Sequence, residues 1–259
     1  MISTNSRRGG ARRALATALC ACFIAAAAAS ELITYGDRDT PAHFTYVYAG
    51  RDWTTLEDYP VCQGSMQSPI NVPRDTALAR VPAAEQSVFQ YGTVQSANTG
   101  TVVNNGHTVQ LLIPAGFAPS NASVVVVGDL NATKPLISQN VARATGAALT
   151  RVPMKPLQLH FHTRSEHLVG GVSYPLEMHI VNAVSQTSVS GCPASPGCLA
   201  VVGVLFELAE EGEETASITE LQKIFDSATD NEDTNATLSA TTLDLSNLLP
   251  TDHTYITYA

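Results

Sequence analysis

Charged residues are scarce in this chain, and basic residues are the scarcer kind. Only 14% of the 259 residues are Asp, Glu, Lys or Arg, and 14 basic residues stand against 23 acidic ones, for a net charge of −9. No stripe rich in lysine or arginine follows the N-terminal segment. Because an acidic surface repels polyanions, we expect neither nucleic acid nor an anionic membrane as a partner.

Several active-site signatures are absent as well. The sequence has no Gly-x-Ser-x-Gly turn, no glycine-rich phosphate loop and no His-Glu-x-x-His helix. Their absence argues against the usual serine hydrolase, nucleotide-binding and zinc peptidase sites. The chain also lacks internal repeats and any composition shift that marks a second domain, so we expect one domain after the N-terminal segment.

The N-terminal segment has the composition of a targeting peptide. Residues 1–30 hold four arginines and no acidic residue, and the arginines precede an alanine-rich apolar stretch, 14–29. Small residues then offer a cleavage site before Glu31, and the stretch is shorter than the ~20 residues that cross a bilayer. We predict a signal or targeting peptide at 1–30 and one domain at 31–259. An uncleaved anchor and a plastid transit peptide are the alternatives.

Two further features agree with secretion. Three Asn-x-Ser/Thr triplets, the acceptor pattern for glycosylation, begin at Asn121, Asn131 and Asn235. Cys192 and Cys198 bracket a short loop that contains Pro and Gly, which favours a disulfide over a metal site in an oxidising compartment. The sequence therefore predicts a secreted protein of the extracellular or periplasmic space, with the plastid lumen as the alternative.

Short runs rich in Val, Leu and Thr, separated by Gly, Asn and Pro, follow one another from residue 87 onward. This pattern is typical of β-strands joined by turns. The expected strands are 87–91, 101–104, 108–113, 123–127, 157–162, 176–181 and 199–208. The predicted fold class is mainly β: a single domain around one large, mostly antiparallel twisted sheet with few short helices.

One helix is expected near the C-terminal third of the chain. Ser217 and Glu220 have the spacing of a capping box, and apolar residues recur at helical intervals from Ile218 to Phe225. The flanking stretches 209–216 and 226–240 are polar, and we expect them to be loops.

The stretch 158–182 holds four of the seven histidines. His160 and His162 are two residues apart, so in a strand they project from the same face. His179 lies in the next apolar run, after a Gly-Gly turn at 170–171, and can reach that face from the neighbouring strand. Three neutral imidazoles leave the fourth tetrahedral position of a zinc ion open, as in catalytic zinc sites.

Hydrogen-bond acceptors accompany two of these histidines. Gln158 lies two residues before His160, and Glu177 lies two before His179, so each shares a strand face with an imidazole that it can orient. These acceptors favour a metal site over an ordinary His-x-His pair packed in a strand.

Two other motifs each leave two interpretations open. His107 follows an Asn-Gly turn. It is either an ordinary turn residue or a solvent-facing proton carrier at the mouth of the metal site. The pair Glu166-His167 is either a surface charge pair or a buried, hydrogen-bonded pair that braces the strand ends.

Four blocks of residues resemble the α-class carbonic anhydrases, and in particular their secreted algal and plant-type members. The blocks occur in the family's order, the resemblance extends over roughly residues 43–258, and the histidine block is the most specific. The four blocks are Gln67–Asn71, Asn104–His107, Gln158–Asn182 and Leu199–Gly203.

This resemblance implies a role for each matched residue around the metal. His160, His162 and His179 match the zinc ligands of the family. Gln158 and Glu177 match the groups that hold the first and the third ligand.

The resemblance also implies the groups that surround the reaction. His107 matches the proton shuttle, and Asn105 and Tyr48 match polar groups that order water. Glu166 matches the acid that orients the family's gatekeeper threonine.

The implied function is the zinc-dependent, reversible hydration of carbon dioxide to bicarbonate and a proton. In this scheme zinc-bound hydroxide attacks carbon dioxide held against Val181 and Val201, and His107 passes the proton to solvent.

The resemblance stops short at the C-terminus. After Thr254–Tyr258 the family continues with Gly-Ser-Leu-Thr-Thr-Pro-Pro, which holds the gatekeeper threonine and leads toward the last strands and a cysteine. The resemblance thus implies a C-terminally incomplete domain in which Cys62 lacks its partner. It also implies the alternative function, a catalytically impaired or silent carbonic-anhydrase-like protein that holds zinc.

Overall fold

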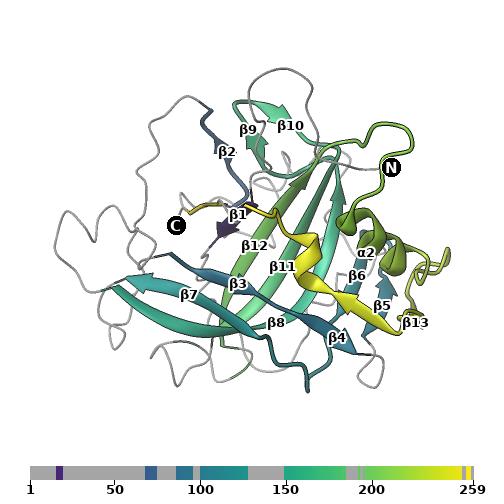
Figure 1. The fold of residues 1–259 in the computed structure, drawn as a ribbon, viewed down its shortest axis with the longest axis horizontal. Helices are drawn as coiled ribbons and strands as arrows, with labels where there is room; N and C mark the ends of the chain where they lie inside the picture. Colours follow the sequence, from purple (N-terminus) through teal and green to yellow (C-terminus); the bar gives the residue numbers. More distant parts are fainter. Residues whose placement is uncertain are drawn as a thin grey trace, which may run out of the picture.

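One large β-sheet organises the fold (Figure 1). The computed structural model describes residues 68–74, 86–95, 100–127, 149–184, 192, 195, 197–252 and 255–257, together with the backbone of residues 16–19. The strand order across the sheet is β13-β5-β6-β8-β11-β12-β1-β15, and β7 pairs with both β3 and β8.

The strands β3, β5, β6, β7, β11 and β12 lie close to predicted runs, β8 extends the predicted run 157–162 toward its N-terminus, and β1, β13 and β15 were not predicted. The bounds are β1 Ala16–Leu19, β3 Val88–Gln90, β5 Thr101–Asn104, β6 Val109–Leu112, β7 Asn121–Val127, β8 Leu149–Thr163, β11 Leu176–Val184, β12 Cys198–Phe206, β13 Thr234–Thr237 and β15 Tyr255–Ile256. Neighbours run antiparallel, except that β1 and β15 are parallel. The prediction of a mainly β fold around a large, mostly antiparallel sheet is confirmed.

The long strand β8 is the centre of the sheet, because it pairs with β6, β7 and β11. Its register with β11 shifts between Val181 and Asn182, where Asn182 lies opposite Pro156 and Val181 lies opposite Gln158. A proline has no backbone N–H to give to the ladder, and prolines within sheets therefore occur at edges or bulges. The shift leaves Gln158 and the residues after it in regular pairing with β11.

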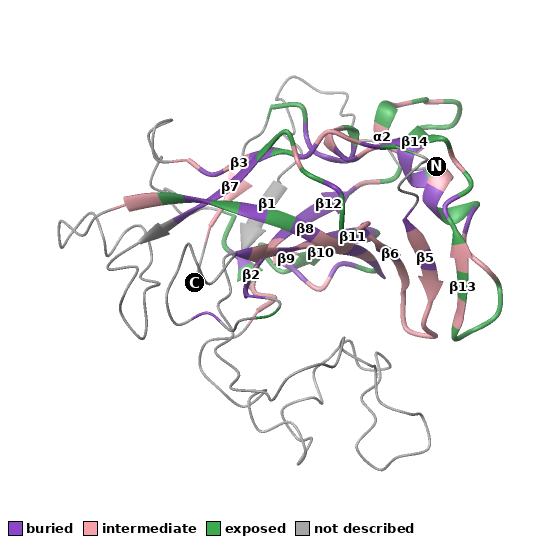
Figure 2. Cartoon of the chain, turned by 90° about the horizontal axis from the view of Figure 1, so that it is seen from below, coloured by how far each residue is buried: buried purple, intermediate pink, exposed green. Residues whose placement is uncertain are grey.

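The central strands have two different faces. Alternate residues of β8, β11 and β12 are buried in the main hydrophobic core, among them Leu159, Phe161, Met178, Ile180, Val202 and Val204. This core face packs against Leu221 and Ile224 of α2 (Ala216–Phe225) and Leu245 and Leu248 of the 3-10 helix η5 (Leu245–Leu248). Figure 2 shows α2 lying on one side of the sheet. The opposite face is left for the histidines.

The helix is present, but its N-terminus differs from the prediction. The N-cap is Thr215, whose hydroxyl accepts a hydrogen bond from the Ile218 backbone N–H at 3.2 Å. Ser217 is therefore a helical residue, and its predicted capping box with Glu220 is wrong. Glu220 is buried instead, where its carboxylate binds Lys223 at 2.9 Å and the backbone N–H of Asp244 at 3.0 Å.

The stretch 226–240, predicted to be a loop, contains strand β13, which pairs with β5 at the edge of the sheet. Its sequence, Thr-Asn-Ala-Thr, has little apolar character, so pairing with β5 rather than burial defines the strand. Two short strands, β4 (Thr93–Gln95) and β14 (Thr242–Asp244), also pair with each other outside the predicted set.

A small three-stranded sheet lies next to the histidine stretch. It consists of β2 (Asn71–Val72), β9 (Leu168–Val169) and β10 (Val172–Ser173). The predicted Gly-Gly turn joins β9 to β10, and both glycines have positive φ, 57° at Gly170 and 79° at Gly171. A side chain at Gly170 would also meet Arg74, since an added Cβ would lie 2.9 Å from the Arg74 Cβ.

The structure also describes the two paired cysteines and part of the N-terminal segment. Cys192 and Cys198 form the predicted disulfide, with both residues buried. Residues 16–19, which lie in the predicted targeting peptide, form β1 beside β12. Among the described residues, no helix is long and apolar enough to cross a membrane.

Candidate metal centre

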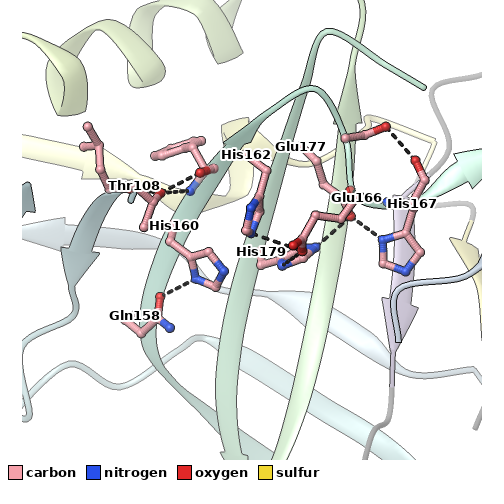
Figure 3. Close-up of polar contacts among 11 residues, drawn as sticks. Thr108, Gln158, His160, His162, Glu166, His167, Glu177 and His179 are labelled. Carbon is pink, nitrogen blue, oxygen red and sulfur yellow. Dashed lines mark hydrogen bonds and ion pairs between the residues drawn. The ribbon is translucent and has the colours of Figure 1, made fainter. Parts of the chain in front are cut away.

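Two neighbouring strands bring three histidines together. His160 and His162 lie on β8, and His179 of β11 stands directly opposite His160 in the register. The centroids of the three imidazole rings are 4.8 to 5.2 Å apart. Each ring offers a nitrogen within 4.8 Å of the other two, which is close enough for one metal ion to bind all three. Figure 3 shows them side by side on one face of the sheet.

Hydrogen bonds fix the orientation of two of these rings. Gln158 Oε1 lies 2.9 Å from His160 Nδ1, and Glu177 Oε1 lies 2.7 Å from His179 Nε2. The sequence predicted both pairings. Because Gln158 engages Nδ1 of His160 and Glu177 engages Nε2 of His179, a metal ion would bind Nε2 of His160 and Nδ1 of His179.

Thr108 holds the strand between the first two histidines. Its hydroxyl donates to the carbonyl of Phe161 at 2.5 Å and accepts from the backbone N–H of Phe161 at 3.0 Å. It therefore hydrogen-bonds both the carbonyl and the N–H of Phe161, the residue between His160 and His162. No sequence pattern signals this contact, since Thr108 reaches β8 from the turn before β6 and lies 53 positions from Phe161.

Glu177 is the most connected acid of the site. It is fully buried, and it stands opposite His162 in the register of β11 and β8. Besides His179, it binds His167 twice: Oε2 accepts from the His167 backbone N–H at 2.9 Å, and Oε1 contacts the His167 Nδ1. His167 is 1% exposed, so the buried alternative for this residue is the correct one.

Burial and charge set the protonation of the three histidines. Burial, followed by the charges of His179 and His162, lowers the pKa of His160 well below its ordinary value. Burial and the charge of His179 likewise lower the pKa of His162 to about 3. Both rings are therefore neutral at neutral pH, which is the form that binds metal.

The third histidine behaves differently. Burial by itself would lower the pKa of His179, but the hydrogen bond and the charge of Glu177 raise it above its ordinary value. Burial opposes ionisation of Glu177 as well, yet its hydrogen bonds with His167 and His179 hold the pKa of this carboxyl well below its usual range. Without metal, His179 and Glu177 thus form a buried ion pair.

Glu166 reaches the same centre from the segment after β8. Its Oε2 lies 3.3 Å from His162 Nε2 and 3.8 Å from His179 Nδ1. Burial is the main cause that raises the pKa of Glu166 to about 7; the charge of His179 lowers it and that of Glu177 raises it. Glu166 is thus a partly buried acid directed at the histidines and not a surface charge.

His107 and Asn105 lie in the tight turn between β5 and β6. Asn105 Oδ1 accepts hydrogen bonds from the backbone N–H groups of His107 at 3.0 Å and of Thr108 at 2.9 Å. Asn105 therefore shapes the turn, while His107 is partly exposed. Since Thr108 contacts Phe161, this turn lies at the same end of the sheet as the histidines.

Apolar residues continue the histidine face along the sheet. Val181 stands opposite Val201 in β12, and both are partly exposed. His179 stands opposite Gly203, which has no side chain to crowd the imidazole. Two other predicted residues, Tyr48 and Asn131, lie outside the described residues, whereas Asn121 and Asn235 are exposed on β7 and β13.

The donor set fits a zinc ion. Three imidazoles in mutual reach, two of them oriented by a buried amide or carboxylate, make a site of the kind that binds zinc in proteins. His160, His162 and His179 are the residues that would hold it.

The fold and the site together define a mainly β protein in which three histidines on one face of the sheet could hold a metal ion. Residues 49–259 match the family model of the eukaryotic-type carbonic anhydrases. The chain therefore belongs to this family, as the four sequence blocks predicted.

Individual relatives agree with this assignment. The chain is 32% identical to human carbonic anhydrase 7 over 185 residues, which cover 68% of this chain and 56% of the human protein. It is 30% identical to a carbonic anhydrase of the alga Dunaliella salina over 70% of this chain and 26% of the algal one. The chain thus spans about half or less of the length of these two relatives.

A solved structure shows the same fold. The α-carbonic anhydrase of Photobacterium profundum matches 81% of this chain and 73% of its own, with a TM-score of 0.51 and 23% sequence identity.

Proposed function

We propose that this chain carries the active centre of a zinc-dependent carbonic anhydrase, which interconverts carbon dioxide and bicarbonate. Family membership supports this proposal, and the observation that carries it is the histidine triad with its two oriented rings. A bound zinc ion supplies Lewis-acid activation of water, and the carbonic anhydrases are the standard example of this chemistry.

Each histidine of the triad, and each acceptor beside it, has its own proposed role in metal binding. His160 and His162 are neutral ligands, and Gln158 fixes the ring of the first. Glu177 fixes the ring of His179 and balances one positive charge of the metal from a buried position. In this proposal, the sheet sets the spacing of the three ligands. Gln158 and Glu177 set the tautomers of His160 and His179.

His107 is the proposed proton carrier between the centre and solvent. An imidazole can both accept and release a proton in the neutral range. His107 is partly exposed in a turn that Asn105 holds by two hydrogen bonds. It therefore has one side toward solvent and a fixed backbone, as a proton carrier requires. Tyr48 is proposed, from the family resemblance alone, as a further polar group of the cavity.

Carbon dioxide is apolar and needs an apolar contact next to the reacting oxygen. Val181, two residues beyond His179 on the histidine face, lies opposite Val201 of β12. We assign these two side chains as the wall against which carbon dioxide rests.

The direct test measures zinc and activity on the same sample. The chain is expected to bind one zinc ion and to hydrate carbon dioxide in a stopped-flow assay, while His179→Ala and His160→Ala lose the metal. His107→Ala should keep the metal and lose rate mainly at low buffer concentration, with recovery on addition of imidazole buffer. A chain that binds zinc at one per molecule without hydrating carbon dioxide contradicts the proposed activity and leaves the zinc-holding alternative.

A secreted, glycosylated protein is the proposed cellular form. The disulfide between Cys192 and Cys198 suits an oxidising compartment, and Asn121 and Asn235 lie exposed as glycan acceptors require. Expression in a eukaryotic secretory host, followed by N-terminal sequencing and mass analysis after deglycosylation, tests both points. A mature chain that begins before Glu31, or unmodified asparagines, contradicts them.

A further inference from the structure

A groove lies on the sheet near the end of β8 that is remote from the histidines. It has a volume of about 700 Å³, within the range of about 300–1,000 Å³ that small-molecule sites occupy. It is lined by residues 116–123, which lead from the connection after β6 into β7, and by Arg151, Pro153, Met154 and Lys155 of β8. The strands β7 and β8 run side by side here (Figure 1). The groove is therefore built on paired strands, as the histidine cluster is.

The groove shares a face of the sheet with the histidines. Lys155 stands opposite Ala183 of β11 in the register, and Ala183 also lines the groove. Ala183 and His179 are four residues apart on β11, so their side chains point to the same side of the sheet. At the rise of a strand, four residues correspond to about 13 Å. The groove thus lies on the histidine face but outside the histidine cluster.

The charged groups that line this groove are basic. Arg151 and Lys155 are among the described lining residues, and none of those residues is acidic, although the chain has a net charge of −9. The Arg151 guanidinium donates to the carbonyl of Gln86 at 2.6 Å, and Lys155 Nζ donates to the carbonyl of Ala115. Because an ammonium group has three N–H donors, Lys155 has further donors to offer a ligand. The groove therefore suits an anion.

A buried hydroxyl lies between these two basic residues. Ser123 stands opposite Pro153 in the register of β7 and β8, so Arg151 and Lys155 are its two diagonal neighbours on one face. Diagonal neighbours are about 7–8 Å apart, within reach of long side chains. Ser123 is 6% exposed, and its Oγ has no hydrogen-bond partner among the described residues. Because a buried hydroxyl without a partner costs free energy, it indicates a ligand that accepts a hydrogen bond at this point.

Apolar side chains supply much of the remaining lining. Phe117, Pro119, Pro153 and Ala183 all border the groove. An inorganic anion leaves these side chains in contact with water, whereas an organic anion with an apolar body covers them. Apolar walls with a few convergent polar groups are the usual construction of small-molecule sites. The lining therefore favours an organic anion over an inorganic one.

We propose that this groove is a second binding site, which takes a small organic anion: a carboxylate or sulfonate on an apolar body. The anionic group accepts hydrogen bonds from Ser123 Oγ and Lys155 Nζ, and Arg151 adds positive charge on the other side of Ser123. The apolar body rests against Phe117 and Pro153. None of these residues belongs to the histidine cluster, so binding here does not require the metal.

The test compares two fluorescent probes that share one aromatic body. Anilinonaphthalenesulfonate (ANS) carries a sulfonate, whereas phenylnaphthylamine is uncharged. Every protein is the full chain with Asn121→Gln, so that no glycan at this lining residue can cover the groove. Lys155→Met should weaken ANS binding about tenfold, because a charge-assisted hydrogen bond is lost, and should leave the affinity for the uncharged probe unchanged. Ser123→Ala should also weaken ANS binding, without loss of stability in urea unfolding.

Arg151→Gln and Arg74→Gln are a matched pair, because each replaces an exposed arginine and Arg74 does not line the groove. Only Arg151→Gln should weaken ANS binding. The ANS affinity should be the same with Zn²⁺ and with chelator, since the groove lies outside the histidine cluster. The inference is overturned by absence of ANS binding, by equal ANS affinity in Lys155→Met and Arg74→Gln, by parallel loss of both probes, or by ANS binding that changes with the metal.

Discussion

His167 binds Glu177 through both its backbone N–H and its ring, although ten residues separate them in the chain. The same carboxylate binds His179 at 2.7 Å, so His167 holds the acid that orients a proposed metal ligand. All three residues are buried, so water has little access and cannot easily replace these hydrogen bonds. His167 and Glu177 therefore form a hydrogen-bonded chain that fixes the ring of His179 in the candidate metal centre.

Replacement of His167 by Ala should weaken metal binding without removing any ligand. Glu177 loses the ring contact that helps to keep it ionised, and its hold on His179 becomes looser. Loss of such supporting groups typically costs 10- to 100-fold in metal affinity. Competition with a chromophoric chelator measures the effect. Ser173→Ala, an exposed change in the neighbouring hairpin, is the control, and equal affinities in the two variants contradict the prediction.

Metal uptake near neutral pH should release about one proton from the triad, and His179 is its source. The pKa of His179 is raised by Glu177, whereas those of His160 and His162 are lowered by burial. Metal affinity should consequently fall as the pH drops through the raised pKa of His179. Calorimetry in buffers of different ionisation enthalpy counts the protons. Glu177→Gln should release fewer, and unchanged release in that variant rules out this assignment.

The metal-free protein should lose stability as the pH rises from about 4.5 to about 7. Glu166 has a pKa of about 7 in the folded chain against an ordinary value of 4.5, so in this window the unfolded chain has lost a proton that the native chain keeps. Unfolding is then favoured by deprotonation, by up to about 3 kcal/mol for a shift of this size. Denaturant unfolding with chelator present measures it. Glu166→Gln should flatten this slope, and an identical slope in both proteins contradicts the assignment.

Two buried polar side chains, Tyr91 and Asn182, lie close to each other, and Asn182 stands at the register shift of β11. The Tyr91 hydroxyl and Asn182 Oδ1 are both buried, and neither has a hydrogen-bond partner among the described residues. Asn182 Nδ2 donates to the carbonyls of Ile180 at 3.0 Å and Ala200 at 3.1 Å.

Tyr91→Phe should therefore leave the stability unchanged or raise it by up to about 1–3 kcal/mol, because it removes a buried hydroxyl that has no hydrogen-bond partner. Urea unfolding measures the change. The substitution keeps the packing of the aromatic ring and removes only the hydroxyl, so a variant less stable than the wild type contradicts the prediction.

The sequence predicted the parts of the fold that depend on short-range pattern. Apolar runs placed the strands, and the spacing of His160 and His162 placed both on one face. It missed β13, whose strand conformation depends on pairing with β5 rather than on its own apolar content. It also misplaced the helix cap, because Thr215 and Ser217 are both good caps and only the path of the chain selects one.

What the sequence determined by itself is the set of three candidate metal ligands and two of their acceptors. Strand periodicity fixes which side chains share a face, and this holds whatever else the chain does. The tertiary structure alone decided the rest: that His179 stands opposite His160, that His167 supports Glu177, and that Glu166 turns back toward the ligands. Those relationships depend on the register between strands and on the turn after β8, where Arg164 has a φ of 64°. No local pattern in a sequence encodes the distances between segments that meet only after folding.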